Sequence, residues 1–366
     1  VNRLLNPDIL TIGFARRFAT YKRGNLLFSD PERLLKLVSH HERPVQFIFA
    51  GKAHPADDEG KKIIQEVYKL SREPQYEGRI VFIEDYDTHI GRRMYHGVDL
   101  WLNNPLRPLE ASGTSGMKLP PNGGLNLSVL DGWWLEGYNG KNGWAIGSEI
   151  EDGTLALQNE IDSNSLYNIL ENQIVPLYYA KPDGKLPLAW IQLMRESIRT
   201  IVPVFNTRRM VQEYNERLYE NAAAATTALS ANNCQTARDL SKWKNDIRLK
   251  WPQLKVLDYH VVPVEDSKDA FFVGEQIEVI AHVHLGDVNP ENVCVQAYYG
   301  PVETNHIHSA STTTLATCKP LDNGDYEYSG MIPASDSGAY GLNIRILPHH
   351  AHLTQDHELR LITWAR

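Results

Sequence analysis

The sequence predicts an α/β domain built on a doubly wound parallel sheet with flanking helices, followed by a β-sandwich. Short apolar runs alternate with amphipathic stretches over residues 9–150, and helical periodicity dominates residues 162–250. After Trp251-Pro252 the chain changes to short alternating β-rich runs. We therefore expect a sheet domain with packed helices at 1–250 and a β-sandwich at 255–366.

Four short apolar runs are the strand candidates of the first domain. They are residues 9–15, 45–50, 80–83 and 125–130. Asp30-Pro31 predicts a helix start with an N-cap and a first-turn proline, and Asp57 predicts a second start. Ligands of doubly wound sheets bind beyond the carboxyl ends of the strands, so polar residues that follow these runs are site candidates.

The second domain is predicted from its β-rich runs. They are residues 271–273, 277–283, 293–299, 326–332, 342–346 and 359–364. About 110 residues of this kind indicate a β-sandwich of the immunoglobulin-like type.

Composition limits the functional classes. Lysine and arginine total 37 against 45 acidic residues, a net charge of −8, which argues against a general binder of nucleic acid or anionic membranes. Three scattered cysteines, Cys234, Cys294 and Cys318, favour a reducing compartment, so we expect a cytoplasmic protein. The sequence contains no long apolar run or signal peptide pattern, and because it starts at Val1 we expect processing or truncation.

The most informative segment is Glu110-Ala111-Ser112-Gly113-Thr114-Ser115-Gly116-Met117-Lys118. Its small residues let backbone N–H groups approach an anion closely, and its lysine can form an imine with an aldehyde cofactor. It predicts an anion site with a covalent anchor.

This run closely resembles the pyridoxal-phosphate-lysine motif of the α-glucan (glycogen, starch, maltodextrin) phosphorylases. Further matching blocks are residues 13–23, 49–55, 82–87, 125–134 and 142–147, and the last two resemble the bacterial and archaeal branch. The resemblance extends from about residue 8 to the carboxyl end and implies the carboxyl-terminal, Rossmann-like lobe of a two-lobed GT-B enzyme.

The resemblance implies a role for each matching site residue. Lys118 would hold pyridoxal 5′-phosphate as an imine, and the other cofactor-binding positions are Arg16, Tyr86, Thr114, Ser115 and Gly116. Arg17 and Lys22 would bind inorganic phosphate, and with Lys118 they form the catalytic set. The positions that would bind the transferred glucosyl unit are Glu110, Ser112 and Gly113. The cofactor phosphate would exchange a proton with inorganic phosphate while the glycosidic bond breaks.

The implied reaction is phosphorolysis of α-1,4-glucan to α-glucose 1-phosphate with retention of configuration. The family's amino-terminal lobe has no counterpart here, so we expect this chain alone to be weak or inactive. Family members are commonly dimers, which makes a homodimer an expectation. Two alternatives stay open: a sugar-nucleotide GT-B glycosyltransferase, and a non-catalytic glucan-binding fragment that uses Trp364 and Tyr298-Tyr299.

Some features depart from the motifs or have an ordinary structural interpretation. Pro120-Pro121 follows the lysine, and because proline disfavours helical geometry at the preceding residue, a helix carrying Lys118 should end there. Arg23 is interpreted as a solvated surface residue. The histidines of 349–352 and His357 lack interleaved acids or cysteines at ligand spacing, so no metal site is predicted.

Overall fold

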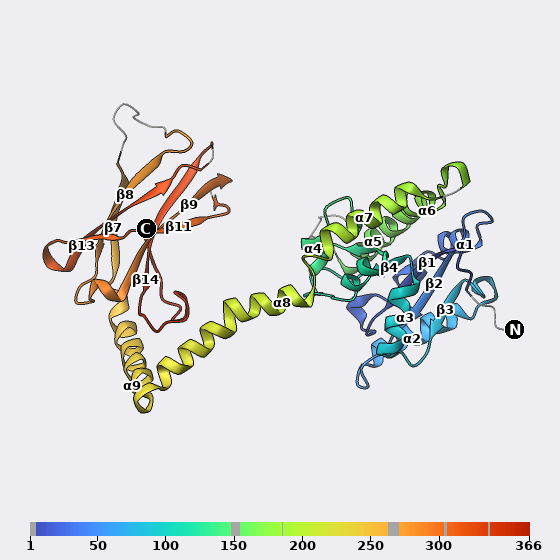
Figure 1. Cartoon of the computed structure of the whole chain (residues 1–366), viewed down its shortest axis with the longest axis horizontal. Helices are drawn as coiled ribbons and strands as arrows, with labels where there is room; N and C mark the ends of the chain where they lie inside the picture. The colour runs from blue at the N-terminus through green and yellow to red at the C-terminus, as the bar shows by residue number, and fades with distance from the viewer. Residues whose placement is uncertain (1–4, 148–153, 185, 263–270, 304–305, 336) are drawn as a thin grey trace. The chain divides into compact units, whose positions relative to one another are not determined.

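The computed structural model describes residues 5–147, 154–184, 186–262, 271–303, 306–335 and 337–366 (Figure 1). The chain divides into two compact units, Val1–Gln212 and Glu213–Arg366. Residues 213–250, which the sequence prediction assigned to the first domain, belong to the second unit in this division, since Ile247 and Trp251 pack in the second unit's core. The predicted domain limits themselves stay a prediction.

The first unit is built on a six-stranded parallel sheet, as predicted. In order across the sheet, the strands are β3 (Ile80–Ile83), β2 (Val45–Ala50), β1 (Leu10–Ala15), β4 (Leu100–Asn103), β5 (Leu125–Val129) and β6 (Gly143–Ile146). The four predicted runs correspond to β1, β2, β3 and β5. The prediction missed β4 and β6, which have only three consecutive apolar residues each, whereas the equally short β3 is apolar throughout.

Helices cover both faces of this sheet. They are α1 (Pro31–Ser39), α2 (Asp58–Ser71), α3 (Thr88–Gly97), α4 (Trp133–Gly137), α5 (Leu155–Ile169), α6 (Val175–Tyr179) and α7 (Leu188–Ile201), with a π-helical turn at Leu170–Ile174. The two predicted helix starts are confirmed: the Asp30 carboxylate accepts from the Arg33 N–H, and the Asp57 carboxylate accepts from the Gly60 N–H.

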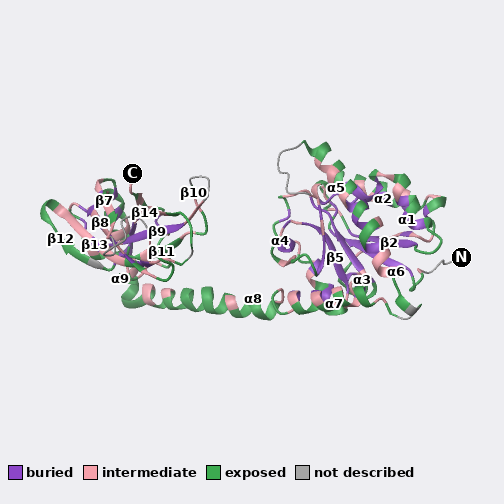
Figure 2. Cartoon of the chain, turned by 90° about the horizontal axis from the view of Figure 1, so that it is seen from above, coloured by how far each residue is buried: buried purple, intermediate pink, exposed green. Residues whose placement is uncertain are grey.

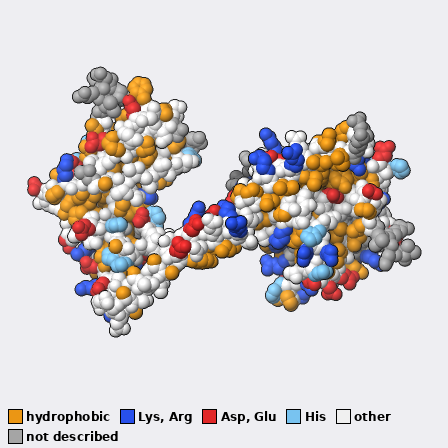
Figure 3. All heavy atoms as spheres, in the orientation of Figure 1, with side chains coloured by type: hydrophobic (Ala, Val, Ile, Leu, Met, Phe, Trp, Pro, Cys, Tyr) orange, Lys and Arg blue, Asp and Glu red, His pale blue; other side chains and the backbone are white. Residues whose placement is uncertain are grey.

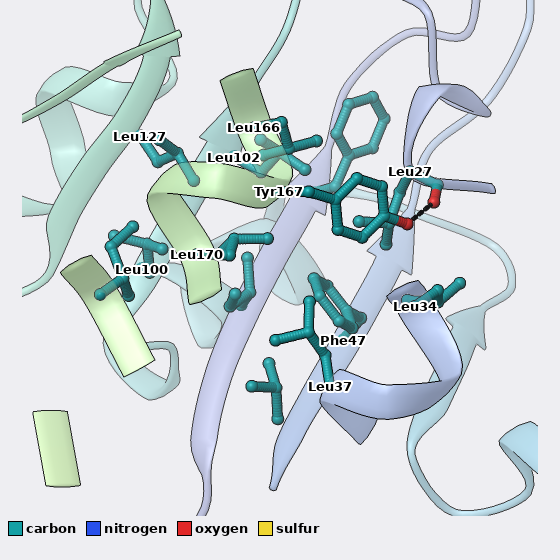
Figure 4. Close-up of a cluster of buried hydrophobic side chains, with 14 of the residues drawn as sticks. Leu27, Leu34, Leu37, Phe47, Leu100, Leu102, Leu127, Leu166, Tyr167 and Leu170 are labelled. Carbon is teal, nitrogen blue, oxygen red and sulfur yellow. Dashed lines mark hydrogen bonds between the residues drawn. The ribbon is translucent and has the colours of Figure 1, made fainter. Parts of the chain in front are cut away.

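Alternate residues of β2 belong to two separate apolar clusters, one on each face of the sheet. Phe47 and Phe49 join the larger cluster, with side chains of α1 and α5, whereas Ile48 and Ala50 join a smaller cluster that includes Met94 of α3. Figure 4 shows the larger cluster, in which the Tyr167 hydroxyl donates to the Leu27 carbonyl. Figure 2 shows the result: the strands of this sheet are buried, and the outer surfaces of the helices are exposed.

The outward face of α3 is basic. Its exposed residues include His89, Arg92, Arg93 and His96 at helical spacing. Figure 3 shows Lys, Arg and His side chains on this part of the surface. The opposite face carries Met94 and Tyr95 toward the sheet, where the Tyr95 ring lies against the Trp101 ring of β4.

Helical residues join the β-sheets of the two units. They form α8 (Thr207–Tyr214), a π-helical turn at Asn215–Tyr219 and α9 (Glu220–Lys250). Within α9 the helix is interrupted, because Ala231 is extended and Asn232, Asn233 and Cys234 have φ values of 50°, 58° and 63°. Among the described residues, no helix is long and apolar enough to span a membrane.

Two antiparallel sheets with a shared core form the second unit, which confirms the predicted β-sandwich. One sheet has the order β12 (Thr317–Pro320), β13 (Asp325–Pro333), β8 (Gln276–His284), β7 (Lys255–Val261). The other has the order β10 (His306–Ile307), β9 (Val293–Glu303), β14 (Tyr340–Pro348), β15 (Thr363–Trp364), with β11 (Ser311–Thr314) also paired to β9.

The predicted runs at 277–283, 293–299, 326–332 and 342–346 lie in β8, β9, β13 and β14. The predicted run at 271–273 forms no strand, and only Thr363–Trp364 of the last run does. Valines of both sheets, including Val279, Val283 and Val295, fill the common core. The immunoglobulin-like subtype stays a prediction.

Candidate active site

Polar side chains from three segments meet beyond the carboxyl ends of β1, β4 and β5. Arg16 directly follows β1, Glu110 lies in the loop after β4, and Asp131 follows β5. The strand order reverses between β1 and β4, which is the position where sheets of this kind bind ligands. All three side chains are buried, so these polar groups form an interior cluster and do not belong to a solvated surface.

Glu110 holds two cations on one oxygen atom. Its Oε2 accepts from Arg16 Nη2 at 2.5 Å and from Lys22 Nζ at 2.9 Å, and all three residues are at most 8% exposed. Burial by itself raises the pKa of Glu110, but the hydrogen bond from Lys22 and the charges of Arg16 and Lys22 outweigh burial, so the pKa lies below its ordinary value. Glu110 is therefore ionised at neutral pH.

A turn after β5 fixes the backbone around Glu110. The Glu110 N–H donates to Asp131 Oδ2 at 2.9 Å, and the Trp133 N–H donates to the Ser112 carbonyl at 2.9 Å. Gly132 has a φ of 55°, and a Cβ atom there would lie 2.4 Å from the Ser112 carbonyl oxygen. Sequence reasoning gave neither Asp131 nor Gly132 a role, although the pair Asp131-Gly132 after an apolar run is a turn signal.

Lys118 ends a short 3₁₀ turn, Gly116–Lys118. Its Nζ donates to the Thr114 carbonyl at 2.9 Å and lies 5.5 Å from the centre of the Tyr95 ring. The side chain is exposed overall, yet partial burial of the ammonium group lowers the pKa of Lys118. A lowered pKa increases the fraction of neutral amine, which is the nucleophilic form.

An aromatic group underlies the segment that ends at Lys118. The Tyr95 and Trp101 rings lie 4.8 Å apart, and Trp101 Nε1 donates to Ser115 Oγ at 3.2 Å. Burial, and then the neighbouring Tyr86, raises the pKa of Tyr95. Tyr86 and Lys118, both predicted site residues, are thus connected through Tyr95, which sequence reasoning missed because β4 and its contact with α3 were not predicted.

The prolines after Lys118 end the turn as predicted, but they do not change the helical backbone angles of Leu119. The 3₁₀ turn ends at Lys118 as expected, and a second one, Pro120–Asn122, follows. However, Leu119 keeps helical angles, with φ −74° and ψ −49°, so the expected loss of helical geometry is wrong. Leu119 is fully buried, and its packing outweighs the proline preference.

Three buried polar atoms at the carboxyl ends of β1 and β4 have no hydrogen-bond partner among the described residues. Among the described residues, Arg16 Nη1, Asn103 Oδ1 and Asn104 Oδ1 are buried and make no hydrogen bond. Asn103 ends β4 and donates through Nδ2 to Ser128 Oγ at 2.9 Å. A buried guanidinium nitrogen with no acceptor fits an anionic group of a ligand, because leaving it unsatisfied costs free energy.

The side chains of the other predicted residues do not join these contacts. Arg17 is exposed, and its side chain makes no hydrogen bond or ion pair with the rest of the described chain. Thr114 and Ser112 are exposed as well, while Gly116 is buried against Asn126 and could not accept a Cβ atom. Arg17, Ser112 and Thr114 are therefore accessible to a ligand, but their side chains do not hold one another in place.

Arg23 is a correction to the sequence interpretation, because it is buried and not solvated. Its Nη2 pairs with Asp162 Oδ2 at 2.6 Å, and its Nε donates to the Asn104 carbonyl at 2.9 Å. The guanidinium thus connects the segment after β1 to α5 and to the segment after β4.

Comparison with known proteins identifies the family. A model described as carbohydrate phosphorylase matches residues 5–167, and one described as glycogen phosphorylase C-terminal domain matches residues 251–366. The chain belongs to the carbohydrate phosphorylase family. The predicted family resemblance is therefore confirmed, and the buried cluster of Arg16, Lys22 and Glu110 lies in the segment that the first model matches.

Two of the phosphorylase relatives match nearly all of this chain. Maltodextrin phosphorylase of Thermococcus litoralis is 42% identical over 98% of this chain and 42% of its own length. Glycogen phosphorylase of Mycobacterium bovis is 38% identical over 98% of this chain and 42% of its own length. Glycogen phosphorylase of Aquifex aeolicus is 55% identical over 59% of this chain. The chain thus spans less than half the length of the first two relatives.

Proposed function

We propose that this chain is the part of an α-glucan phosphorylase that holds pyridoxal 5′-phosphate and forms one wall of the catalytic crevice. The whole protein would convert α-1,4-glucan and inorganic phosphate to α-glucose 1-phosphate with retention. The observation that carries the proposal is the buried Glu110 carboxylate that organises Arg16 and Lys22 while Arg16 Nη1 has no acceptor among the described residues.

The residues around Lys118 fit a phosphorylated aldehyde cofactor. Lys118 would hold the aldehyde, because its lowered pKa favours the reactive amine, and Tyr86 would lie beside the ring. Arg16 supplies the unpaired N–H for the cofactor phosphate, with Thr114, Ser115 and Gly116 as further donors. When bound, the cofactor supplies a phosphate group that can exchange a proton with inorganic phosphate.

The remaining site residues would hold phosphate and sugar. Arg17 and Lys22 would bind inorganic phosphate. Inorganic phosphate and the cofactor phosphate repel each other, so the two can lie close together only if cations neutralise them. Both Arg16 and Lys22 bind Glu110 Oε2, whereas Oε1 makes no hydrogen bond with a described residue. Oε1 can therefore accept from a glucosyl hydroxyl, and a Cβ atom at Gly113 would lie 3.6 Å from it. Ser112 would add a further contact to the sugar.

The first two relatives are more than twice as long as this chain, which suggests that further protein supplies the other wall of the cleft. We expect an amino-terminal lobe in the whole protein, weak or no phosphorolysis by the 366-residue chain alone, a homodimer, and a cytoplasmic location. Size-exclusion chromatography with light scattering of the whole protein tests the dimer.

Covalent labelling tests the proposal directly. After incubation with pyridoxal phosphate and borohydride reduction, peptide mapping should find a pyridoxyl group on Lys118. Lys118→Arg should abolish it, while Lys52→Arg, which changes an exposed lysine, should leave it intact. Whole protein that leaves Lys118 unlabelled and transfers glucose from a sugar nucleotide would instead be a sugar-nucleotide glycosyltransferase.

A further inference from the structure

A row of side chains crosses the outer face of one sheet of the β-sandwich. Cross-strand pairing places Trp364 of β15 opposite Arg345 of β14, and Arg345 opposite Gln296 of β9. Tyr298 follows Gln296 by two positions and so lies on the same face. We call Gln296, Tyr298, Arg345 and Trp364 the aromatic row.

The alternation of burial shows that this face points away from the core. Val295, Ala297 and Tyr299 of β9 are buried in the core shared by the two sheets, and Ile344 and Ile346 of β14 are fully buried there. Residues between them therefore project to the other side of the sheet, where Tyr298 and Arg345 are half-buried and Gln296 is buried. The sequence prediction paired Tyr298 with Tyr299 for glucan binding, and that pairing is wrong, because Tyr299 is 6% exposed and belongs to the core.

Contacts within the aromatic row hold its rings in place. The Tyr298 and Trp364 rings are 5.2 Å apart at 85°, and the Arg345 guanidinium lies 5.6 Å from the centre of each. Arg345 Nε and Nη2 donate to Gln296 Oε1 at 2.9 and 2.7 Å. Trp364 is nevertheless 37% exposed.

The charge of this surface is unbalanced. Among the described residues, Arg345 forms no ion pair with a carboxylate, and its acceptor is the neutral amide of Gln296. The neighbours across the sheet, Asn343 opposite Tyr298 and Thr314 opposite Gln296, are polar and uncharged. The paired positions therefore present aromatic surface and N–H donors, and the carboxylates of Glu291 and Asp356 line a pocket beside Gln296 and Thr314 without pairing with Arg345.

We propose that the aromatic row is a second binding site for α-1,4-glucan, separate from the crevice around Glu110. The choice of glucan as the ligand rests on the proposed function. Sugar rings present C–H groups that pack on aromatic faces, while their hydroxyl oxygens accept from guanidinium and amide N–H groups. The glucan is neutral and rich in hydrogen-bond acceptors. The aromatic row offers one cation, Arg345, which has no carboxylate partner among the described residues.

The shape of the surface favours a chain over a single sugar. Trp364, Arg345 and Gln296 lie on three adjacent strands, so the row spans two interstrand spacings, about 10 Å. A sheet face of this length can bind consecutive glucosyl units, and it would hold a polymer near the catalytic protein between reactions, raising its effective concentration.

Affinity electrophoresis of the 366-residue chain in native gels with and without glycogen tests the site. Glycogen should retard the parent chain, and Trp364→Ala and Tyr298→Ala should each weaken apparent binding at least fivefold. Trp364→Phe should keep part of the binding, since it retains a ring. The matched control is Tyr219→Ala, which removes an aromatic residue that is 57% exposed outside the sandwich and should change nothing.

Each outcome decides between the proposals. Parent chain that glycogen does not retard, or alanine variants that bind like the parent, would overturn the aromatic row as a glucan site. Circular dichroism melting shows whether a variant that loses binding is still folded, and Arg345→Gln, which keeps the aromatic rings, gives a second measure of the same site. Glycogen binding that depends on Trp364 while Lys118 remains unlabelled by pyridoxal phosphate would support the row and reject the proposed function.

Discussion

At the buried Glu110 carboxylate, two cations bind one oxygen atom, so removing the negative charge leaves both without a partner. The arrangement differs from a surface ion pair, in which water would replace the lost contact. Here burial makes the charge of Glu110 a determinant of stability as well as of ligand binding.

Glu110→Gln should lower the free energy of unfolding by roughly 3 kcal/mol, because Arg16 and Lys22 would lose their counter-ion. Inorganic phosphate should then stabilise the variant more than the parent, since an anion can replace the lost charge. Urea unfolding with phosphate, and with chloride at equal ionic strength, measures both effects. Equal stabilisation of the two proteins by phosphate would contradict the assignment of Lys22 to a phosphate site.

The same carboxylate predicts a pH dependence. The folded pKa of Glu110 lies below its ordinary value of 4.5, so its contribution is complete above that value and is lost as pH falls through the lowered folded pKa. The stability difference between parent and Glu110→Gln should therefore be constant near neutral pH and shrink in acid below about pH 4.5. Denaturant titrations across this range check it, and a difference that grows in acid would show that the sign is wrong.

Much of the site could be predicted at the level of individual residues. The motif placed Arg16, Lys22 and Glu110 in one site, and they are in contact. The motif could not show that Glu110 binds both cations directly, because this contact depends on how the loop after β4 folds back toward the segment after β1. Arg23 was misread for a related reason: its partner Asp162 lies 139 positions away, and no local pattern reveals such a contact.

Turns and helix ends are the elements that position the site. The turn after β5 forces Gly132 into a left-handed conformation directly against the Ser112 carbonyl. A side chain at that position would push the segment carrying Glu110 out of place.

Gly132→Ala should destabilise the protein by about 2 kcal/mol or more and weaken pyridoxal phosphate labelling of Lys118. Gly97→Ala is the matched control: it lies at the end of α3 with no atom within 4 Å of an added Cβ, and should be neutral or slightly stabilising. Thermal melts and labelling yields measure both variants. Equal effects of the two substitutions would argue against a specific role for the turn.

The ion pair between Arg23 and α5 gives a second prediction for the elements. Asp162→Asn should cost about 3 kcal/mol, because both side chains are at most 5% exposed and Arg23 would keep a buried charge. Asp58→Asn removes the exposed partner of Lys61 in α2 and should give no measurable change. Urea unfolding of both variants makes the comparison, and a neutral Asp162→Asn would show that the pair contributes little.

The strand prediction had a physical limit at this scale. Apolar runs such as those of β1, β2 and the four-residue β3 were found, and the N-caps at Asp30 and Asp57 were confirmed. The strand β4 has only three apolar residues before Asn103 and Asn104, so its periodicity is too short to separate from a loop. Missing it also hid Trp101 and the aromatic group beneath Lys118.

Over the whole molecule, each unit has its own apolar core. The first cluster includes Leu127 of β5, and the sandwich core includes Val279 of β8, with no residue common to both clusters. Separate cores allow each unit to unfold as a cooperative unit of its own.

Leu127→Ala and Val279→Ala should therefore affect different unfolding transitions. Each removes a fully buried side chain and should destabilise its unit by about 2 to 4 kcal/mol. Differential scanning calorimetry should resolve two transitions, with Leu127→Ala lowering the midpoint of one and Val279→Ala the midpoint of the other. A single transition that both substitutions shift equally would mean that the units unfold together.

The interruption inside α9 has a practical consequence for protein engineering. Residues 231–234 are exposed, and their backbone has already left the helical conformation through three consecutive left-handed residues. Inserting a short flexible peptide there breaks no continuous helix and costs mainly the entropy of a longer loop, which grows slowly with length. Asn232-Asn233 therefore offers a place for an epitope tag or a fluorophore-binding sequence that leaves both apolar cores unchanged.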